Sequence, residues 1–199
     1  FTRRRQPKRP TGVFEKLLSQ RIVALALPIS DEVAHKLVAE LLYLSDINDK
    51  PITLYINSPG GSVTSGLAII DAMELIKPQV FTTCVGRADA MAAQILASGS
   101  KGSRFAVPSA SISISKLWSS KQTLTAGEHH LQNKEIGRLQ DTLIKMLAKR
   151  TGQTPAIIAS DVLNGRSFTA PEAIDYGLID AILEKPTSKD IGSPHDGPQ

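Results

Sequence analysis

Two adjacent glycines, Gly60 and Gly61, are the residues whose types and spacing most directly suggest chemistry. They end the run Asn-Ser-Pro-Gly-Gly, which follows a β-branched and aromatic segment at 52–56 and precedes an apolar helical pattern. A glycine turn between a strand and a helix lets the backbone approach a ligand and presents N–H groups to it. Such a turn can hold a phosphate, a thioester oxygen or the oxyanion of an acyl-transfer reaction, or it can be a plain tight turn.

Acyl transfer by a serine would also need a histidine within hydrogen-bond reach and an acid that orients it. The sequence places no histidine beside a serine; the histidines are His35, His129, His130 and His195. No Cys and His spacing indicates a metal site, and the glycine pair is not a nucleotide-binding fingerprint. We therefore expect neither a metal nor a cofactor.

The elements that would position the glycine turn alternate between strand and helix. Strands are predicted at 22–27, 52–56, 80–85, 104–107, 111–115 and 179–183, and helices at 13–20, after Ser30, at about 62–77, at 89–98, at about 126–150, after Thr154 and after Thr169. Alternation of this kind predicts an α/β protein with parallel strands and right-handed crossovers.

The helix at about 126–150 is long for a small domain, because it spans about 37 Å at the usual rise per residue. Its apolar stripe includes Leu131, Leu139 and Leu143. We expect part of this helix to project from the domain and to need a partner surface.

The chain has 199 residues, a length that fits one domain, and a formal net charge of +4. Five basic residues lie in the first ten, so the arm predicted at 1–12 is basic and the remainder is near neutral, which does not favour nucleic acid. Cys84 is the one cysteine and is interpreted as a buried structural thiol in a reducing compartment. No apolar run approaches the ~20 residues of a membrane helix, and residues 185–199 are predicted to be a disordered tail.

Over about residues 14–184, the chain resembles the Clp protease core family, the ClpP-like proteins. The motifs that carry the resemblance are the segment 54–66, Lys101-Gly-x-Arg-Phe105, Lys149-x-Thr-Gly-Gln153 and Ala170-Pro-Glu-Ala-x-x-Tyr-Gly-Leu-Ile-Asp180. The resemblance implies a ClpP/crotonase-like spiral of repeated ββα units at 13–184, with a protruding handle at about 124–150. It also implies that Gly60 and Gly61 belong to an oxyanion turn.

At the positions that match the family's triad, the functional groups are absent. The serine position, in Gly86-Arg-Ala-Asp-Ala-Met-Ala-Ala93, is Ala90. The histidine position, seven residues after Pro108, is Ser115, and the acid position is Gly165. A scaffold without its triad resembles the non-catalytic ClpR-type subunits, in which Gly60 and Gly61 would be a vestigial oxyanion turn that holds peptide backbone without cutting it.

By the same resemblance, the chain would join catalytic ClpP and other ClpR paralogues in a two-ring tetradecamer that encloses a chamber for protein degradation. A ClpC- or ClpX-type AAA+ chaperone would feed unfolded proteins into it. Matching positions suggest a chaperone-docking cleft at Tyr55, Leu75 and Phe105, and a ring-to-ring handle at Leu131, Leu139 and Leu143. The basic arm favours the chloroplast stroma, with a cyanobacterial cytoplasm as the alternative.

Two other functions stay open from the sequence. A crotonase-like acyl-CoA enzyme could use the Gly60–Gly61 turn with Glu74 or Asp71 as its acid. An active serine peptidase could use a relocated triad.

Overall fold

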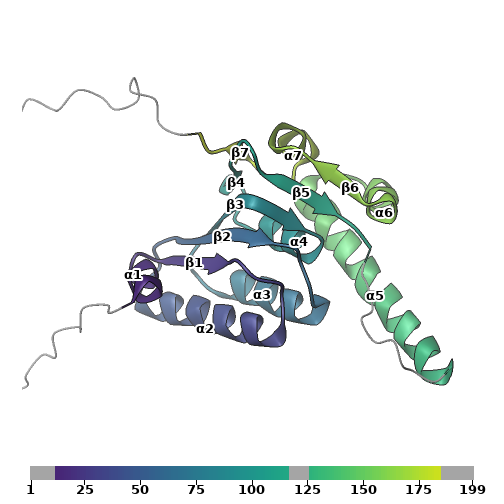
Figure 1. Ribbon diagram of the computed structural model, residues 1–199, viewed down its shortest axis with the longest axis horizontal. Coiled ribbons are helices and arrows are strands. Elements are labelled where there is room, and N and C mark those ends of the chain that lie inside the picture. Colours follow the sequence, from purple (N-terminus) through teal and green to yellow (C-terminus); the bar gives the residue numbers. More distant parts are fainter. Residues whose placement is uncertain (1–11, 117–125, 185–199) are drawn as a thin grey trace, which may run out of the picture.

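The computed structural model describes residues 12–116 and 126–184, and among residues 126–135 it describes the backbone alone (Figure 1). The arm predicted at 1–12, except Gly12, and the tail predicted at 185–199 lie outside these residues. The elements are, in order, α1 Val13–Ser19, β1 Ile22–Leu25, α2 Asp31–Ile47, β2 Ile52–Ser58, α3 Val63–Leu75, β3 Val80–Asp89, α4 Met91–Ala97, β4 Arg104–Ala106, β5 Ser111–Ile114, α5 Ala126–Thr151, α6 Pro155–Asn164, β6 Arg166–Phe168, α7 Ala170–Tyr176 and β7 Ala181–Ile182.

The strands form one mixed sheet that is mostly parallel. Its main order is β1-β2-β3-β4-β7, and all of these neighbours pair in parallel. A branch leaves β3, where β5 pairs in parallel, and β6 pairs antiparallel with β5. The predicted α/β class is therefore confirmed, and it is consistent with the fold that the resemblance implies.

Helices cover one face of the sheet and leave the other face partly open. Along β2, Ile52, Leu54 and Ile56 are fully buried, whereas Tyr55 between them is 39% exposed. On the covered side, the hydroxyl of Thr82 in β3 donates to the carbonyl of Leu96 in α4. This alternation follows from the two-residue period of a strand and shows that the core lies between the sheet and the helices (Figure 1).

Strand β3 is longer than the predicted segment 80–85, which we expected to end in a turn at Gly86. The strand continues through Gly86, whose φ is +92°, because it changes partner there. Its first half pairs with β4, and residues Arg87–Asp89 pair with β5. The three-residue strand β6 was not predicted, since it is short and begins with two exposed polar residues.

The three polar residues after which helices are predicted all act as caps. The hydroxyl of Ser30 accepts from the N–H of Val33 at the start of α2, the hydroxyl of Thr154 accepts from the N–H of Ile157 at the start of α6, and Thr169 and Glu172 form a capping box at the start of α7. Helix α5 corresponds to the predicted long helix and extends beyond the rest of the described chain (Figure 1).

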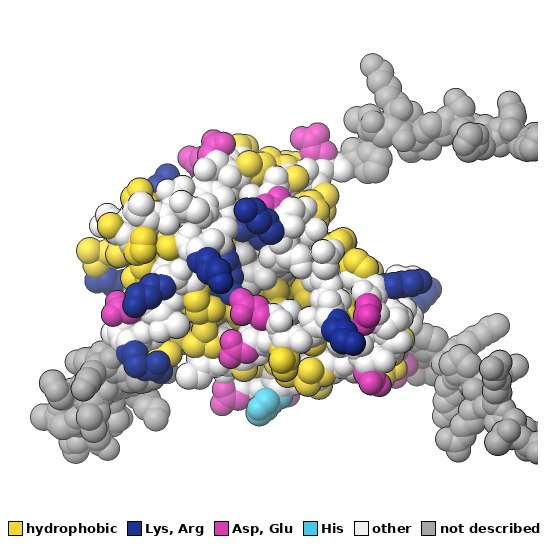
Figure 2. Space-filling view, turned by 180° about the vertical axis from the view of Figure 1, so that it is seen from behind, with side chains coloured by type: hydrophobic (Ala, Val, Ile, Leu, Met, Phe, Trp, Pro, Cys, Tyr) yellow, Lys and Arg dark blue, Asp and Glu magenta, His cyan; other side chains and the backbone are white. Residues whose placement is uncertain are grey.

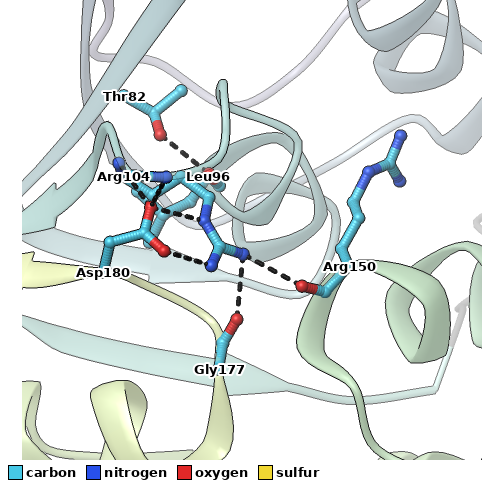
Figure 3. A network of polar contacts seen from close by, with 7 residues as sticks. Thr82, Leu96, Arg104, Arg150, Gly177 and Asp180 are labelled. Atoms are coloured by element: carbon cyan, nitrogen blue, oxygen red, sulfur yellow. Dashed lines mark hydrogen bonds and ion pairs between the residues drawn. The ribbon is translucent and has the colours of Figure 1, made fainter.

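Arg104 of β4 fastens the C-terminal elements to the sheet (Figure 3). Its side chain is 5% exposed and donates from Nε and Nη2 to the two carboxylate oxygens of Asp180. Its Nη1 donates to the carbonyls of Gly177 and Arg150, the latter in the last turn of α5. One buried guanidinium therefore joins β4, α5 and the segment after α7.

On the face seen in Figure 2, basic and acidic side chains are interspersed, as expected of a body with little net charge. None of the helices that the structure describes is both long and apolar enough to cross a membrane.

Candidate functional site

The glycine turn after β2 is held by hydrogen bonds to the segment after β1. The N–H of Ile29 donates to the carbonyl of Gly60 at 2.8 Å, and the N–H of Ser62 donates to the carbonyl of Ile29 at 2.8 Å. Gly60 has a φ of +83° and Gly61 a φ of +148°. A Cβ atom on Gly61 would lie 2.3 Å from the carbonyl oxygen of Ile29. Both positions therefore require glycine.

The two glycine N–H groups are not equivalent. The fully buried Ser58 accepts from the N–H of Gly60 at 3.2 Å, and its hydroxyl donates to the carbonyl of Leu27. The Gly60 N–H is thus engaged within the turn, which corrects the expectation that both amides are directed at a ligand. Within the described residues the N–H of Gly61 has no acceptor, so it is the donor of this pair that a ligand could use.

Ala90 has an unusual backbone conformation at the start of α4. Its φ is +48° and its ψ is −110°, and among the described residues only Arg21 shares a positive φ without being glycine. A side chain in this region costs about 1–3 kcal/mol and persists where surrounding contacts hold it. The N–H of Ala90 donates to the carbonyl of Ser113 at 2.8 Å, which supplies one such contact. Ala90 lies between β3 and α4, and a strained strand-to-helix turn of this kind presents the nucleophilic serine in α/β-hydrolases.

The Ala90 turn and the glycine turn lie directly against each other. A Cβ atom on Gly60 would come within 3.3 Å of Ala90 Cβ, 3.2 Å of the Met91 nitrogen and 2.6 Å of the Asp89 carbonyl oxygen. The Met91 nitrogen is in the first turn of α4, where N–H groups lack partners within the helix. The turn that the resemblance assigned to an oxyanion and the position that it assigned to a nucleophile are therefore in contact.

Ser115 and Gly165 lie at facing ends of two paired strands, directly after β5 and directly before β6. Strand β5 pairs with β3 through Asp89 and Ser113, and with β6 through Ile114 and Arg166. Ser115 and Gly165 each lie one residue beyond that last pair, on facing chains. The structure therefore brings together the three positions that the resemblance assigned to the triad.

These three residues cannot perform acyl transfer as a triad does. Ala90 offers a methyl group, and Gly165 has no side chain and occupies the left-handed C-cap of α6 with a φ of +71°. Ser115 carries a hydroxyl, which is not a base at neutral pH. These three positions thus supply no nucleophile, no general base and no acid.

A carboxylate that the sequence did not single out lies beside the site. Asp89 precedes Ala90, accepts a hydrogen bond from Ser113 Oγ at 2.7 Å, and lies 3.6 Å from the Arg87 guanidinium. Its carboxylate is therefore held between Ser113 and Arg87, one residue before Ala90. The only signal in the sequence was its position next to Ala90.

Of the predicted docking residues, the structure brings two together and leaves the third apart. Tyr55 pairs with Thr83, and Thr83 pairs with Phe105, so the two rings share one cross-strand row on the open face. They are two strands apart, or about 10 Å. Leu75 is 79% exposed at the end of α3, which belongs to the helical layer. One chain by itself therefore does not form a cleft from all three.

The three leucines predicted for the ring-to-ring handle do not share one exposed surface. Leu143 is 4% exposed and packs in the core of its own chain, which corrects its assignment to a ring-to-ring surface. Leu139 is half-buried, and the side chain of Leu131 lies outside the described residues. The sequence pattern defined the apolar stripe but not the point at which α5 leaves the core.

The residues proposed for the other two functions lie away from the glycine turn. Glu74 is near the end of α3, about 16 Å along the helix from Val63, and its Oε1 accepts from Arg150. Asp71 is exposed on the same helix. His35 is exposed on α2, and no hydroxyl bonds to it within the described residues; the side chains of the other histidines lie outside them.

Comparison with known proteins identifies relatives over nearly the whole chain. The family model described as Clp protease matches residues 5–186. Two relatives from Dehalococcoides mccartyi, strains BAV1 and CBDB1, are each described as an ATP-dependent Clp protease proteolytic subunit. Each is 42% identical to this chain over 183 residues, which cover 92% of this chain and 91% of the relative.

Proposed function

The chain belongs to the Clp protease family, and we propose that it is a catalytically inactive, ClpR-type subunit of the proteolytic core. The family forms oligomeric assemblies with Clp ATPases. In this proposal the chain contributes structure to the degradation chamber, and its partner subunits cut the substrate. Its similarity to proteins described as proteolytic subunits supports the scaffold and the assembly, whereas its own residues argue against a role in cleavage.

The observation that carries the proposal is Ala90. It keeps the strained backbone of a nucleophile turn, with a φ of +48°, and it lies against the glycine turn, but it carries only a methyl group. Ser115 and Gly165 complete the argument, because a nucleophile at position 90 would find neither a histidine nor a carboxylate on the adjoining strands.

Two surfaces of the chain support a role in assembly. A parallel sheet is normally covered on both faces, yet here Tyr55, Val85 and Phe105 lie on a face without helices, and Val85 is 41% exposed. Helix α5 also extends beyond its own domain (Figure 1). In the proposed assembly, a neighbouring subunit of the same ring covers the sheet face, and the opposing ring packs against the start of α5.

The same open face suggests how a chaperone could dock. Tyr55 and Phe105 of one subunit and the exposed Leu75 of its neighbour would form an apolar cleft for a ClpC- or ClpX-type chaperone. We place the complex in the chloroplast stroma, with catalytic ClpP and other ClpR paralogues in two stacked rings, and a cyanobacterial cytoplasm is the alternative.

Active-site labelling tests the loss of catalysis. The purified full chain is treated with a fluorophosphonate probe and a β-lactone probe, and the relative from Dehalococcoides mccartyi strain BAV1 is the positive control. We expect labelling of the relative and none of this chain. Covalent labelling of any serine in this chain would refute the proposal. It would favour the alternative of an active serine peptidase with a relocated triad.

Native mass spectrometry of the complex isolated from chloroplast stroma tests the assembly. We expect this chain in a two-ring particle together with subunits that have a serine at the position that matches Ala90. A particle that contains this chain alone, or a free monomer, would contradict the assembly.

Binding of an acyl-CoA thioester to the purified chain would favour the crotonase-like alternative.

A further inference from the structure

A cavity of about 530 Å³ lies at the end of α4 remote from Ala90. It forms where Ser98, the C-cap of α4, meets the loop before β4 and the last turns of α5. The volume is in the range of about 300–1,000 Å³ that is usual for small-molecule sites. Since Ala90 and Ser98 cap opposite ends of α4, about 12 Å separate this cavity from the candidate catalytic positions.

Basic side chains from two separate segments line the cavity. Lys101 precedes β4, and Lys149 and Arg150 lie in the last turn of α5. Within the described residues, neither lysine has an ion-pair partner. Arg104 also touches the cavity, but Asp180 neutralises it. Glu74 is the one carboxylate of the lining, so two positive charges remain uncompensated.

Arg150 has a donor that the protein does not satisfy. Its Nη2 donates to Glu74 Oε1 at 2.5 Å, but its Nη1 is buried and has no hydrogen-bond partner. Figure 3 shows the Arg150 side chain turned away from Arg104, so the two guanidinium groups do not serve the same acceptors. A buried charged donor without an acceptor is unfavourable, and an anion bound beside the Arg150 guanidinium, which lines the cavity, would offset its charge.

We propose that this cavity binds a small phosphorylated molecule, with its phosphate group on Lys101, Lys149 and Arg150. A phosphate dianion matches the two uncompensated charges, and a guanidinium nitrogen with neighbouring ammonium groups is a typical phosphate donor set. The side chains of Ala97 and Met146 give the cavity an apolar wall, on which the organic part of the ligand packs.

The favourable effect of basic residues on a helix C-terminus does not account for this arrangement. That effect would explain Lys149 and Arg150 at the end of α5. It does not explain Lys101, which comes from another segment, or the buried Nη1 of Arg150. The cavity is separate from the catalytic positions, so the inference does not depend on whether the chain cleaves peptides.

Isothermal titration calorimetry on the full chain tests the site with three probes at matched ionic strength: inorganic phosphate, glycerol 3-phosphate and acetate. We expect saturable binding of both phosphate compounds, tighter binding of glycerol 3-phosphate, and none of acetate. Binding of acetate as tight as that of phosphate would overturn the assignment to a phosphate group. If inorganic phosphate binds and glycerol 3-phosphate does not, the claim that the ligand's organic part packs on the apolar wall is wrong. If neither phosphate compound binds, the whole proposal is wrong.

Variants decide whether binding occurs in this cavity. Lys101 and Lys149 are exposed, so Lys101→Met and Lys149→Met should fold normally, and each should weaken phosphate binding by about tenfold or more. Lys145→Met is the matched control, because Lys145 is exposed on the same helix but does not line the cavity. Equal affinities in Lys149→Met and Lys145→Met would overturn the site.

Discussion

The carbonyl oxygen of Ser113 accepts the backbone N–H of Ala90 at 2.8 Å and so helps to hold Ala90 at a φ of +48°. The strain serves a nucleophile when a serine is present, but an alanine gains nothing from it. The turn persists because α4 must start at this point to pack in the core, where all seven of its residues are buried.

We predict that Ala90→Gly stabilises the protein. Glycine at position 90 would relieve about 1–3 kcal/mol of backbone strain in the folded protein. This gain is larger than the stabilisation of the unfolded chain by the added glycine, which is about 0.4–1 kcal/mol. The free energy of unfolding in urea should therefore rise by about 1 kcal/mol. Ala68→Gly, at an exposed position within α3, is the control and should lower it by about 0.5–1 kcal/mol. A loss of stability in Ala90→Gly would show that the positive φ carries no strain.

Gly60 and Gly102 form a matched pair, since both have a φ of +83°. A Cβ atom on Gly102 would meet nothing within 4 Å, whereas on Gly60 it would lie 2.6 Å from the carbonyl oxygen of Asp89. We predict that Gly102→Ala costs about 1 kcal/mol of stability, from backbone strain alone. Gly60→Ala should cost at least about 3 kcal/mol, because backbone must also move. Thermal or urea denaturation measures both, and equal losses would mean that the Ala90 turn can yield.

A third prediction concerns reconstruction of a triad. Ala90→Ser alone restores a hydroxyl without a base, so it should not react with a fluorophosphonate. Ala90→Ser, Ser115→His and Gly165→Asp together should give slow labelling, since these positions lie around the end of β5, which pairs with β3 on one side and β6 on the other. Aspartate tolerates the left-handed backbone of Gly165, where a Cβ atom meets nothing within 4 Å. Labelling of Ala90→Ser alone would reveal a base that the described residues do not provide.

What could be predicted from sequence was largely local. The strand, glycine turn and helix around Gly60 follow from adjacent residues, and so do the caps at Ser30 and Thr169. The strain at Ala90 could not be predicted, because alanine gives no sign of a positive φ. The contact between Asp89 and Ser113 depends on the register of two strands, which no short pattern defines. Likewise, the burial of Leu143 depends on where α5 docks.

Cys84 should be unreactive in the folded protein. Its side chain is fully buried, and burial, with a smaller contribution from the charge of Asp89, raises the pKa of its thiol to about 12. The nucleophilic thiolate is therefore nearly absent at neutral pH. Ellman's reagent should detect no rapid thiol in the native chain and one thiol per chain in concentrated guanidinium chloride, since the sequence has one cysteine. Fast reaction of the native protein would mean that β3 opens readily.

Because of Asp180, the free energy of unfolding should fall at low pH. Burial by itself raises the pKa of this carboxyl, but the hydrogen bonds and charge of Arg104, with the N–H of Gly102, lower it below its ordinary value of 3.8. The unfolded chain therefore binds the proton more readily than the folded chain does. The stabilisation is complete above pH 3.8 and is lost as the pH falls through the lowered pKa.

Asp180→Asn tests this dependence. It leaves the buried guanidinium of Arg104 unpaired and should lower the free energy of unfolding at pH 7 by about 3 kcal/mol. Asp71→Asn, at an exposed carboxylate of α3, is the control and should change it by less than about 0.5 kcal/mol. As the pH falls from 3.8 through the lowered pKa, the folded wild type also loses the charge at Asp180, so the difference between wild type and Asp180→Asn should shrink. Urea denaturation at a series of pH values measures it, and a difference that stays constant would show that Asp180 acts through its shape and not through its charge.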